Sequence, residues 1–151
     1  MTIIRQEFSR VFAPQSSQSV VYSHAMSPLL DRFLRGENCV FFAYGMTNSG
    51  KTHTIQGTSV DHGLFPRLVA EILDNMSSSN GSGWALTASV LEIYQEKIFD
   101  LIVKRTDKAD RPEKLTIRDV NGKVEICKLS EHSIKTITDA TKLMDLAAAN
   151  R

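Results

Sequence analysis

The chain has 151 residues, the size of one ordinary domain, which excludes a long multidomain assembly within this polypeptide. Charged residues make up 23% of it, and 18 basic against 17 acidic residues leave a net charge of +1, so neither a disordered tail nor a strongly basic nucleic-acid-binding protein is indicated. No apolar run approaches the roughly 20 residues needed to cross a bilayer, and the first residues are too polar for a signal peptide. We expect a soluble, intracellular protein with no membrane or nucleic-acid partner.

The first predicted element is helical. Its apolar face carries Tyr22, Met26, Leu29 and Phe33. Because Pro28 removes a backbone donor inside this span, the helix either bends there or restarts with Ser27 as its N-cap. Both arrangements remain open.

A buried strand is predicted next, over residues 39–44. This run is apolar throughout, has the length of a strand and ends on Gly45. A helix follows over residues 65–76, whose apolar positions recur at three- and four-residue steps, with Pro66 tolerated in its first turn. The small polar residues of 77–83 favour turns and predict a loop.

The second half of the chain predicts strands and a last helix. Residues 84–94 are rich in aromatic and β-branched side chains and indicate one strand covered on both faces. Asn121-Gly122 separates two strand-like segments and has the residue types of a type I′ hairpin turn. The apolar spacing of residues 140–147 predicts a terminal helix, with Thr138 as N-cap and Asp139 in the first turn.

The residues between the predicted strand 39–44 and the next helix match the phosphate-loop pattern G-x-x-x-x-G-K-[ST]. In such a loop, glycines let the backbone curl so that its N–H groups point at phosphate oxygens, and the start of the next helix adds its positive dipole end. Lys51 is expected to reach the β- and γ-phosphates, and the Thr52 hydroxyl to bind Mg²⁺. The predicted loop residues are Gly45, Met46, Thr47, Asn48, Ser49, Gly50, Lys51 and Thr52.

Hydrolysis also needs a carboxylate that follows a second buried strand and holds Mg²⁺ through water. Glu92 is the one candidate, but more strand-like residues follow it, so a structural acid within a strand is the alternative interpretation. Asp100 has the pattern of the polar side of a short packed turn.

Residues 42–54 resemble the F-A-Y-G-Q-T-G-S-G-K-T-H-T sequence of the kinesin motor domain, with Met46 in place of the usual glutamine. Residues 63–67 are similar to the family's G-[IL]-x-P-R, and residues 91–101 to its S-x-E-I-Y-N-E-x-I-x-D-L-L segment. Asn150-Arg151 resembles the end of its G-x-x-N-R sequence. The resemblance runs in the family's order over nearly the whole chain.

This resemblance implies an α/β fold, part of a P-loop NTPase: a mostly parallel sheet with flanking helices, plus a β-hairpin lobe. It implies a single partial motor domain over residues 1–151, incomplete at both ends, because the sequence lacks the family's first strand with its R-x-R-P and also lacks the two switch sequences N-x-x-S-S-R-S-H and D-L-A-G-S-E. Those two switches supply the Mg²⁺-side and water-positioning groups, so we expect no ATP turnover by this chain alone. We also expect residues 39–44 to show unpaired edges and exposed apolar faces, and the 151-residue chain on its own to have low stability.

The resemblance further implies the ATP-binding part of a kinesin-type microtubule motor, cytoplasmic and associated with the cytoskeleton, with ATP and Mg²⁺ as ligands. It adds His53 to the nucleotide site, near the adenine. It assigns Arg118 and Lys123 to a lobe that contacts tubulin, where local positive charge suits an acidic polymer, and a solvated hairpin tip is the alternative.

Two other classes of function stay open. The chain could be a non-catalytic kinesin-like module that binds tubulin or another partner without turnover, or a different P-loop ATPase that uses Glu92. The sequence does not indicate the kinesin subfamily, the direction of movement, the cargo or the oligomeric state.

Overall fold

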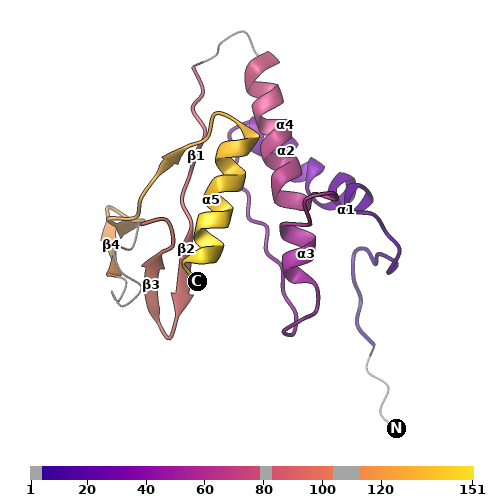
Figure 1. Cartoon of the computed structure of the whole chain (residues 1–151), viewed down its shortest axis with the longest axis horizontal. Coiled ribbons are helices and arrows are strands. Elements are labelled where there is room, and N and C mark those ends of the chain that lie inside the picture. Colours follow the sequence, from indigo (N-terminus) through magenta and orange to yellow (C-terminus); the bar gives the residue numbers. More distant parts are fainter. Residues whose placement is uncertain (1–4, 79–82, 104–112) are drawn as a thin grey trace. The chain divides into compact units, whose positions relative to one another are not determined.

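The computed structural model describes residues 5–78, 83–103 and 113–151, which form two compact units, residues 1–72 and residues 73–151 (Figure 1). The long helix α4 (Leu64–Ser78) begins in the first unit and ends in the second. It confirms the helix predicted over residues 65–76. Of the loop predicted over residues 77–83, Ser77 and Ser78 are helical, and residues 79–82 lie outside the described residues.

The first unit begins with two short helices, α1 (Gln18–Ala25) and α2 (Ser27–Leu34). Met26 separates them: its N–H donates to the Tyr22 carbonyl at 2.8 Å, which ends α1, and it is also the N-cap of α2. The restart at Pro28 is therefore confirmed, because proline lies in the first turn of α2. The prediction of Ser27 as cap is wrong, since Ser27 is already helical and Met26 offers no side-chain acceptor.

Helices α2 and α4 supply the core of this unit. Buried apolar side chains are Met26, Leu30, Leu64, Val69 and Ile72. Across the same region the Tyr22 hydroxyl donates a hydrogen bond to the Glu71 carboxylate, and burial together with this bond raises the pKa of Tyr22 above its ordinary value. The core is not filled completely, because an apolar cavity of about 340 Å³ remains between these helices and Phe41.

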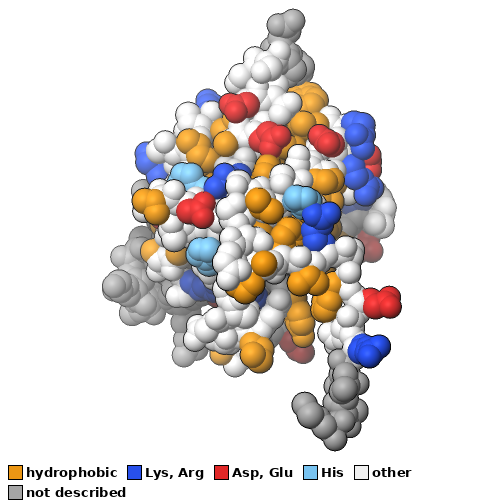
Figure 2. Space-filling model, turned by 90° about the vertical axis from the view of Figure 1, so that its right-hand side faces the viewer, with side chains coloured by type: hydrophobic (Ala, Val, Ile, Leu, Met, Phe, Trp, Pro, Cys, Tyr) orange, Lys and Arg blue, Asp and Glu red, His pale blue; other side chains and the backbone are white. Residues whose placement is uncertain are grey.

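Residues 39–44 do not form the predicted buried strand. They take part in no strand pairing with any described residue, and Val40, Phe42 and Tyr44 are 82%, 77% and 93% exposed. An apolar run becomes a buried strand only where neighbouring strands take its hydrogen bonds and other elements cover its faces. The exposed apolar faces expected for this segment are confirmed, and Figure 2 shows apolar side chains open to solvent on one side of the molecule.

The second unit contains two small sheets. Strands β1 (Thr87–Ala88) and β6 (His132–Ser133) pair with each other. The larger sheet has the order β2-β3-β4-β5 and consists of β2 (Leu91–Tyr94), β3 (Lys97–Asp100), β4 (Lys114–Val120) and β5 (Lys123–Cys127). Every pair among these described strands is antiparallel, so this part of the chain shows the expected hairpin lobe and no parallel pair.

Tight turns explain the antiparallel pairing of β2 with β3 and of β4 with β5, since parallel strands need a crossover of a dozen or more residues. Asn121 and Gly122 have φ angles of 55° and 78° between β4 and β5, which confirms the predicted type I′ hairpin. Gln95 and Glu96 also have positive φ angles and turn the chain between β2 and β3.

The single buried strand predicted over residues 84–94 is wrong. The segment divides into β1 and β2, which belong to different sheets, and Trp84, Ile93 and Tyr94 are 51%, 68% and 60% exposed. Two hydrogen bonds hold the residues between the two strands. The Ser89 hydroxyl donates to the Ser130 carbonyl at 2.7 Å, and the Val90 carbonyl accepts from the Leu101 N–H at 3.0 Å.

Helix α5 (Ile137–Ala149) confirms the predicted terminal helix, but its N-cap is Thr136 and not Thr138. The Asp139 N–H donates to the Thr136 hydroxyl at 3.2 Å, and the Thr136 N–H donates back to the Asp139 carboxylate at 2.8 Å. A capping box needs its acidic residue three positions after the N-cap. Asp139 meets this condition for Thr136 and not for Thr138. Among the described residues, none of the helices is long and apolar enough to span a bilayer.

Candidate nucleotide site

The segment from Gly45 to Gly50 forms an exposed loop that leads into the short helix α3 (Lys51–Ile55). Gly45, Asn48 and Gly50 have φ angles of 155°, 63° and 91°, a region that glycine and asparagine reach at least cost. A Cβ on Gly45 would lie 2.7 Å from the Ser49 hydroxyl, which could rotate away, so the φ angle is the stronger reason for glycine here. The predicted glycines therefore do shape the loop.

The start of α3 leaves backbone donors open. Its N-cap is Gly50, which offers no side-chain acceptor. Among the hydrogen bonds of the described residues, the N–H groups of Gly50, Lys51 and Thr52 donate to no protein acceptor. Unpaired, exposed amides that converge at the start of a helix after a glycine loop fit a phosphate group.

Lys51 closes the loop. Its ammonium group donates to the carbonyls of Gly45 at 2.9 Å and Met46 at 2.6 Å. No carboxylate of the described residues lies within ion-pair distance of Lys51, so its charge is balanced only by carbonyl dipoles. Thr52 is exposed beside it, and its hydroxyl makes no hydrogen bond to a described residue. The loop thus offers a cation, open amides and a free hydroxyl, the groups that hold a Mg²⁺-bound polyphosphate.

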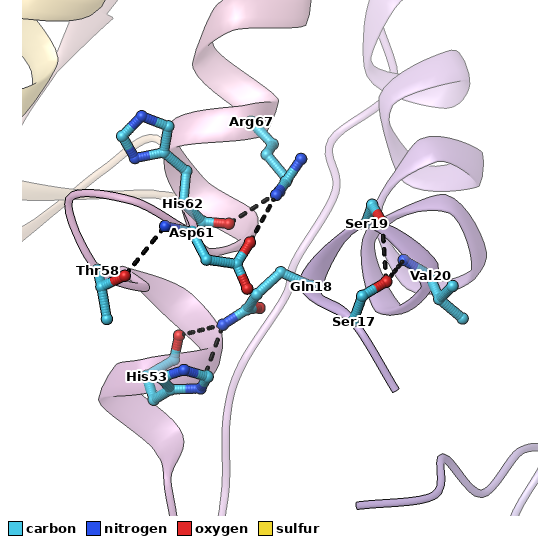
Figure 3. Close-up of polar contacts among 9 residues, drawn as sticks. All are labelled: Ser17, Gln18, Ser19, Val20, His53, Thr58, Asp61, His62 and Arg67. Carbon is cyan, nitrogen blue, oxygen red and sulfur yellow. Dashed lines mark hydrogen bonds and ion pairs between the residues drawn. The ribbon is translucent and has the colours of Figure 1, made fainter. Parts of the chain in front are cut away.

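His53 lies next to the loop and contacts a residue that the sequence analysis missed. The Gln18 side-chain amide at the start of α1 donates to the His53 carbonyl at 2.7 Å and approaches the His53 ring nitrogen Nδ1 at 3.2 Å (Figure 3). Gln18 is only 5% exposed, whereas His53 is exposed. No local pattern could have predicted this contact, because the two residues are 35 positions apart and glutamine at the start of a helix is ordinarily solvated.

The turn after α3 is fixed by two glycines and an arginine. A Cβ on Gly57 would lie 2.1 Å from the Gly63 nitrogen, so the two backbones can approach only because both residues lack side chains. Arg67 of α4 donates to the His62 carbonyl at 2.8 Å and pairs with Asp61 at 3.0 Å (Figure 3). These contacts tie the end of α3 to the first turns of α4, and they give a structural reason for glycine and arginine in residues 63–67.

In the second unit, Arg118 and Lys123 lie on the β4–β5 hairpin. Arg118 stands opposite Glu125 and Val120 opposite Lys123, so strand alternation puts both cations on the same face of the hairpin. Both are exposed, and neither forms an ion pair with an acid of the described residues.

The two acidic residues considered in the sequence have structural contacts in the second unit. Glu92 accepts a hydrogen bond from the Arg151 guanidinium at 3.1 Å. Asp100 is 7% exposed and accepts from the N–H groups of Ile102 and Ser130, each at 2.8 Å. Burial alone would raise the pKa of Asp100, but these hydrogen bonds outweigh it and hold the pKa below its ordinary value. The described residues contain no cluster of three or more histidine, cysteine or acidic side chains that could hold a metal ion.

Comparison with known proteins gives one consistent result. The sequence profile of the kinesin motor domain matches residues 3–151. The chain is 33% identical to the kinesin-like protein KIN-5A of Arabidopsis thaliana over 95% of its length, and 36% identical to kinesin-like protein 5 of Schizosaccharomyces pombe over 98%. It spans only 15% and 17% of those two relatives.

Solved structures agree with the sequence matches. The structure of a KIF14 dimer in its two-heads-bound AMP-PNP state, in complex with a microtubule, superposes with a TM-score of 0.84 at 31% identity. The match covers 90% of this chain and 38% of that one. A KIF14 structure with ADP in complex with a microtubule gives a TM-score of 0.83.

These matches define the class of protein first: the fold is an α/β P-loop NTPase fold. The chain belongs to the kinesin motor domain family, which is a family of nucleotide-binding ATPases. Membership in this family removes the alternative of an unrelated P-loop ATPase built around Glu92.

Proposed function

We propose that this chain is the ATP-binding part of a kinesin-type microtubule motor, working in the cytoplasm on the cytoskeleton. The proposal rests on the loop at residues 45–52, where open amides, a lysine without an ion pair and a free threonine hydroxyl lie together. The finer assignment of ATP with Mg²⁺ rests on this donor set and on the family to which the chain belongs.

Each group has a distinct role in this proposal. The open backbone amides of Gly50, Lys51 and Thr52 donate to the phosphates, and the Lys51 ammonium group exchanges its two carbonyl acceptors for β- and γ-phosphate oxygens. The Thr52 hydroxyl would be a ligand of Mg²⁺, and the ion would neutralise charge on the phosphates. His53 lies beyond the phosphates and contacts the nucleoside.

The partner that we propose is the microtubule, because solved relatives of this chain are in complex with microtubules. Arg118 and Lys123 are the residues of this chain that suit that contact. They lie on one exposed face of the hairpin, where positive charge without an intramolecular ion pair steers association with an acidic surface.

The direct test is Mg²⁺-ATP binding by the chain with Lys51→Ala. We expect affinity to fall by about 10- to 100-fold, because a charge-assisted hydrogen bond contributes about 1.5–3 kcal/mol. Lys142→Ala on the exposed face of α5 is the matched control and should leave the affinity unchanged. Equal affinities of the wild type and Lys51→Ala, measured by calorimetry, would refute the assignment of the site.

The alternative is a non-catalytic module that binds tubulin through Arg118 and Lys123. These hairpin residues belong to a different compact unit from the loop at residues 45–52. Co-sedimentation with microtubules separates the two functions. The binding module would be favoured if microtubule binding is unaffected by ATP and by Lys51→Ala but is lost in Arg118→Ala/Lys123→Ala.

A further inference from the structure

Gln18 is one of two buried polar or charged side chains among the described residues, the other being Asp100. Its amide nitrogen Nε2 lies 2.7 Å from the His53 carbonyl oxygen and 3.2 Å from Nδ1 of the His53 ring (Figure 3). A buried amide with both contacts on one residue connects the start of α1 to the helix that follows the phosphate loop.

The first contact fixes the direction of the second. A carbonyl oxygen only accepts hydrogen bonds, so Gln18 must present its NH₂ group to His53. The same NH₂ group faces Nδ1, which must therefore act as the acceptor. In the neutral imidazole one nitrogen accepts and the other carries the proton, so this geometry puts the proton of His53 on Nε2.

The exposed edge of the His53 ring then carries a hydrogen-bond donor, Nε2–H. Nδ1 and Nε2 point in widely different directions from the imidazole, so an Nε2–H group points away from Gln18. His53 is exposed and directly follows Thr52, at the margin of the predicted phosphate site. A ligand held by its phosphates would meet a hydrogen-bond donor there.

We propose that Gln18 is a positioning residue: it fixes the Nε2–H tautomer and the orientation of His53, so that His53 donates a hydrogen bond to the nucleoside part of a bound nucleotide. The tautomer stands on the contacts of Gln18 alone, and the contact with the nucleoside rests on the proposed function. Gln18 does not touch the phosphates in this scheme.

The tautomer can be measured without any nucleotide. Long-range ¹H–¹⁵N correlation spectra of the 151-residue chain, recorded at pH 8 with ¹⁵N-labelled histidine, distinguish Nδ1–H from Nε2–H. We expect the Nε2–H pattern for His53 in the wild type. In Gln18→Glu the donor becomes an acceptor of nearly the same shape, and we expect the Nδ1–H pattern. Gln6→Glu makes the same chemical change at an exposed position and should leave the spectrum of His53 unaltered.

The binding test separates positioning from general support of the loop. ATP and inorganic tripolyphosphate are titrated into the wild type and into Gln18→Leu, which keeps the volume but removes the donor. We expect the affinity for ATP to fall by about 3- to 10-fold, the effect of one net hydrogen bond, and the affinity for tripolyphosphate to stay constant. In a His53→Ala background, Gln18→Leu should have no further effect on ATP.

Three outcomes would overturn the inference. These are an Nδ1–H pattern in the wild type, a tautomer that Gln18→Glu leaves unchanged, and equal losses for ATP and tripolyphosphate in Gln18→Leu. The last would mean that Gln18 only supports α3. A wild-type chain that binds neither ligand would refute the proposed function and the nucleoside contact with it, while the spectra would still decide the tautomer.

Discussion

The β4–β5 hairpin and residues 39–44 are both segments of strand-forming sequence, yet they end in different environments. The hairpin strands exchange hydrogen bonds with each other through a two-residue turn, from Thr116 opposite Cys127 to Val120 opposite Lys123. Residues 39–44 have no described strand beside them and expose Val40, Phe42 and Tyr44 to solvent. A segment with high strand propensity therefore forms a strand only where a second segment can pair with it, and a tight turn places that second segment beside it.

The same contrast extends to the two units. In the second unit, the buried carboxylate of Asp100 and the first turn of α5 have their hydrogen bonds satisfied within the unit. In the first unit, apolar side chains surround a cavity of about 340 Å³, and the apolar run next to the phosphate loop is exposed. We therefore expect substitutions in the second unit to cost stability and substitutions in residues 39–44 to cost little.

The largest contrast is expected between two aliphatic truncations. Ile98 is 7% exposed in β3, and Ile98→Ala should lower the free energy of unfolding by about 2–5 kcal/mol through lost burial and a new cavity. Val40 is 82% exposed, and Val40→Ala should change the free energy of unfolding by less than about 0.5 kcal/mol. Urea unfolding followed by circular dichroism measures both, and similar costs would mean that residues 39–44 are packed in solution.

A smaller effect is expected at Asp100. In Asp100→Asn one of the two backbone N–H groups loses its acceptor, which should cost about 1–3 kcal/mol. Asp145→Asn on the exposed face of α5 is the control and should stay within about 0.5 kcal/mol.

The acid limb of the stability curve tests the same residue. Because the folded-state pKa of Asp100 is lowered, its contribution is fully present above the unfolded carboxyl pKa of about 3.9 and is lost as the pH falls through the folded value. Asp100→Asn should therefore show a shallower loss of stability below about pH 4 than the wild type. An unchanged slope would show that the carboxylate is not paired as the structure has it.

The smallest effect is expected at the cap of α5. Thr136→Ala removes the hydroxyl that accepts from the Asp139 N–H and should cost about 0.5–2 kcal/mol. Thr138→Ala, two positions inside the helix, should be neutral or slightly stabilising, since alanine has the higher helix propensity. A larger loss for Thr138→Ala in thermal unfolding would restore Thr138 as the cap.

Features whose causes lie within a few residues could be predicted from the sequence. The apolar spacing of α4 and the Asn121-Gly122 turn each depend on neighbours in the chain, and the structure confirms them. At Pro28 the sequence left a bent helix and a restart open, and the structure shows the restart. The conformation of the loop at residues 45–50 is of the same kind, since Gly45 and Gly50 have positive φ angles that favour glycine. Its binding of phosphate stays a prediction. The assignment of Lys51 and Thr52 to nucleotide and Mg²⁺ stays a prediction.

Features that depend on distant parts of the chain could not be predicted. The division of residues 84–94 into two strands depends on their different partners: β1 pairs with β6, which lies far along the sequence, whereas β2 pairs with β3. The contact of Gln18 with His53 links residues 35 positions apart, and no periodic pattern in the sequence indicates it. The N-cap of α5 depends on residues that are neighbours in the sequence. The choice between Thr136 and Thr138 depended on the reciprocal hydrogen bond with Asp139.

The central claim is that the open amides at the start of α3 hold the phosphates of a nucleotide. The most direct measurement is a titration of the ¹⁵N-labelled 151-residue chain with Mg²⁺-ATP, followed through the amide resonances of Gly50, Lys51 and Thr52. We predict saturable shifts of these three amides in the wild type, and half-saturation at about 10- to 100-fold higher ATP in Lys51→Ala. Resonances that do not move at saturating ATP, or that reach half-saturation at the same ATP concentration in Lys51→Ala, would contradict the account.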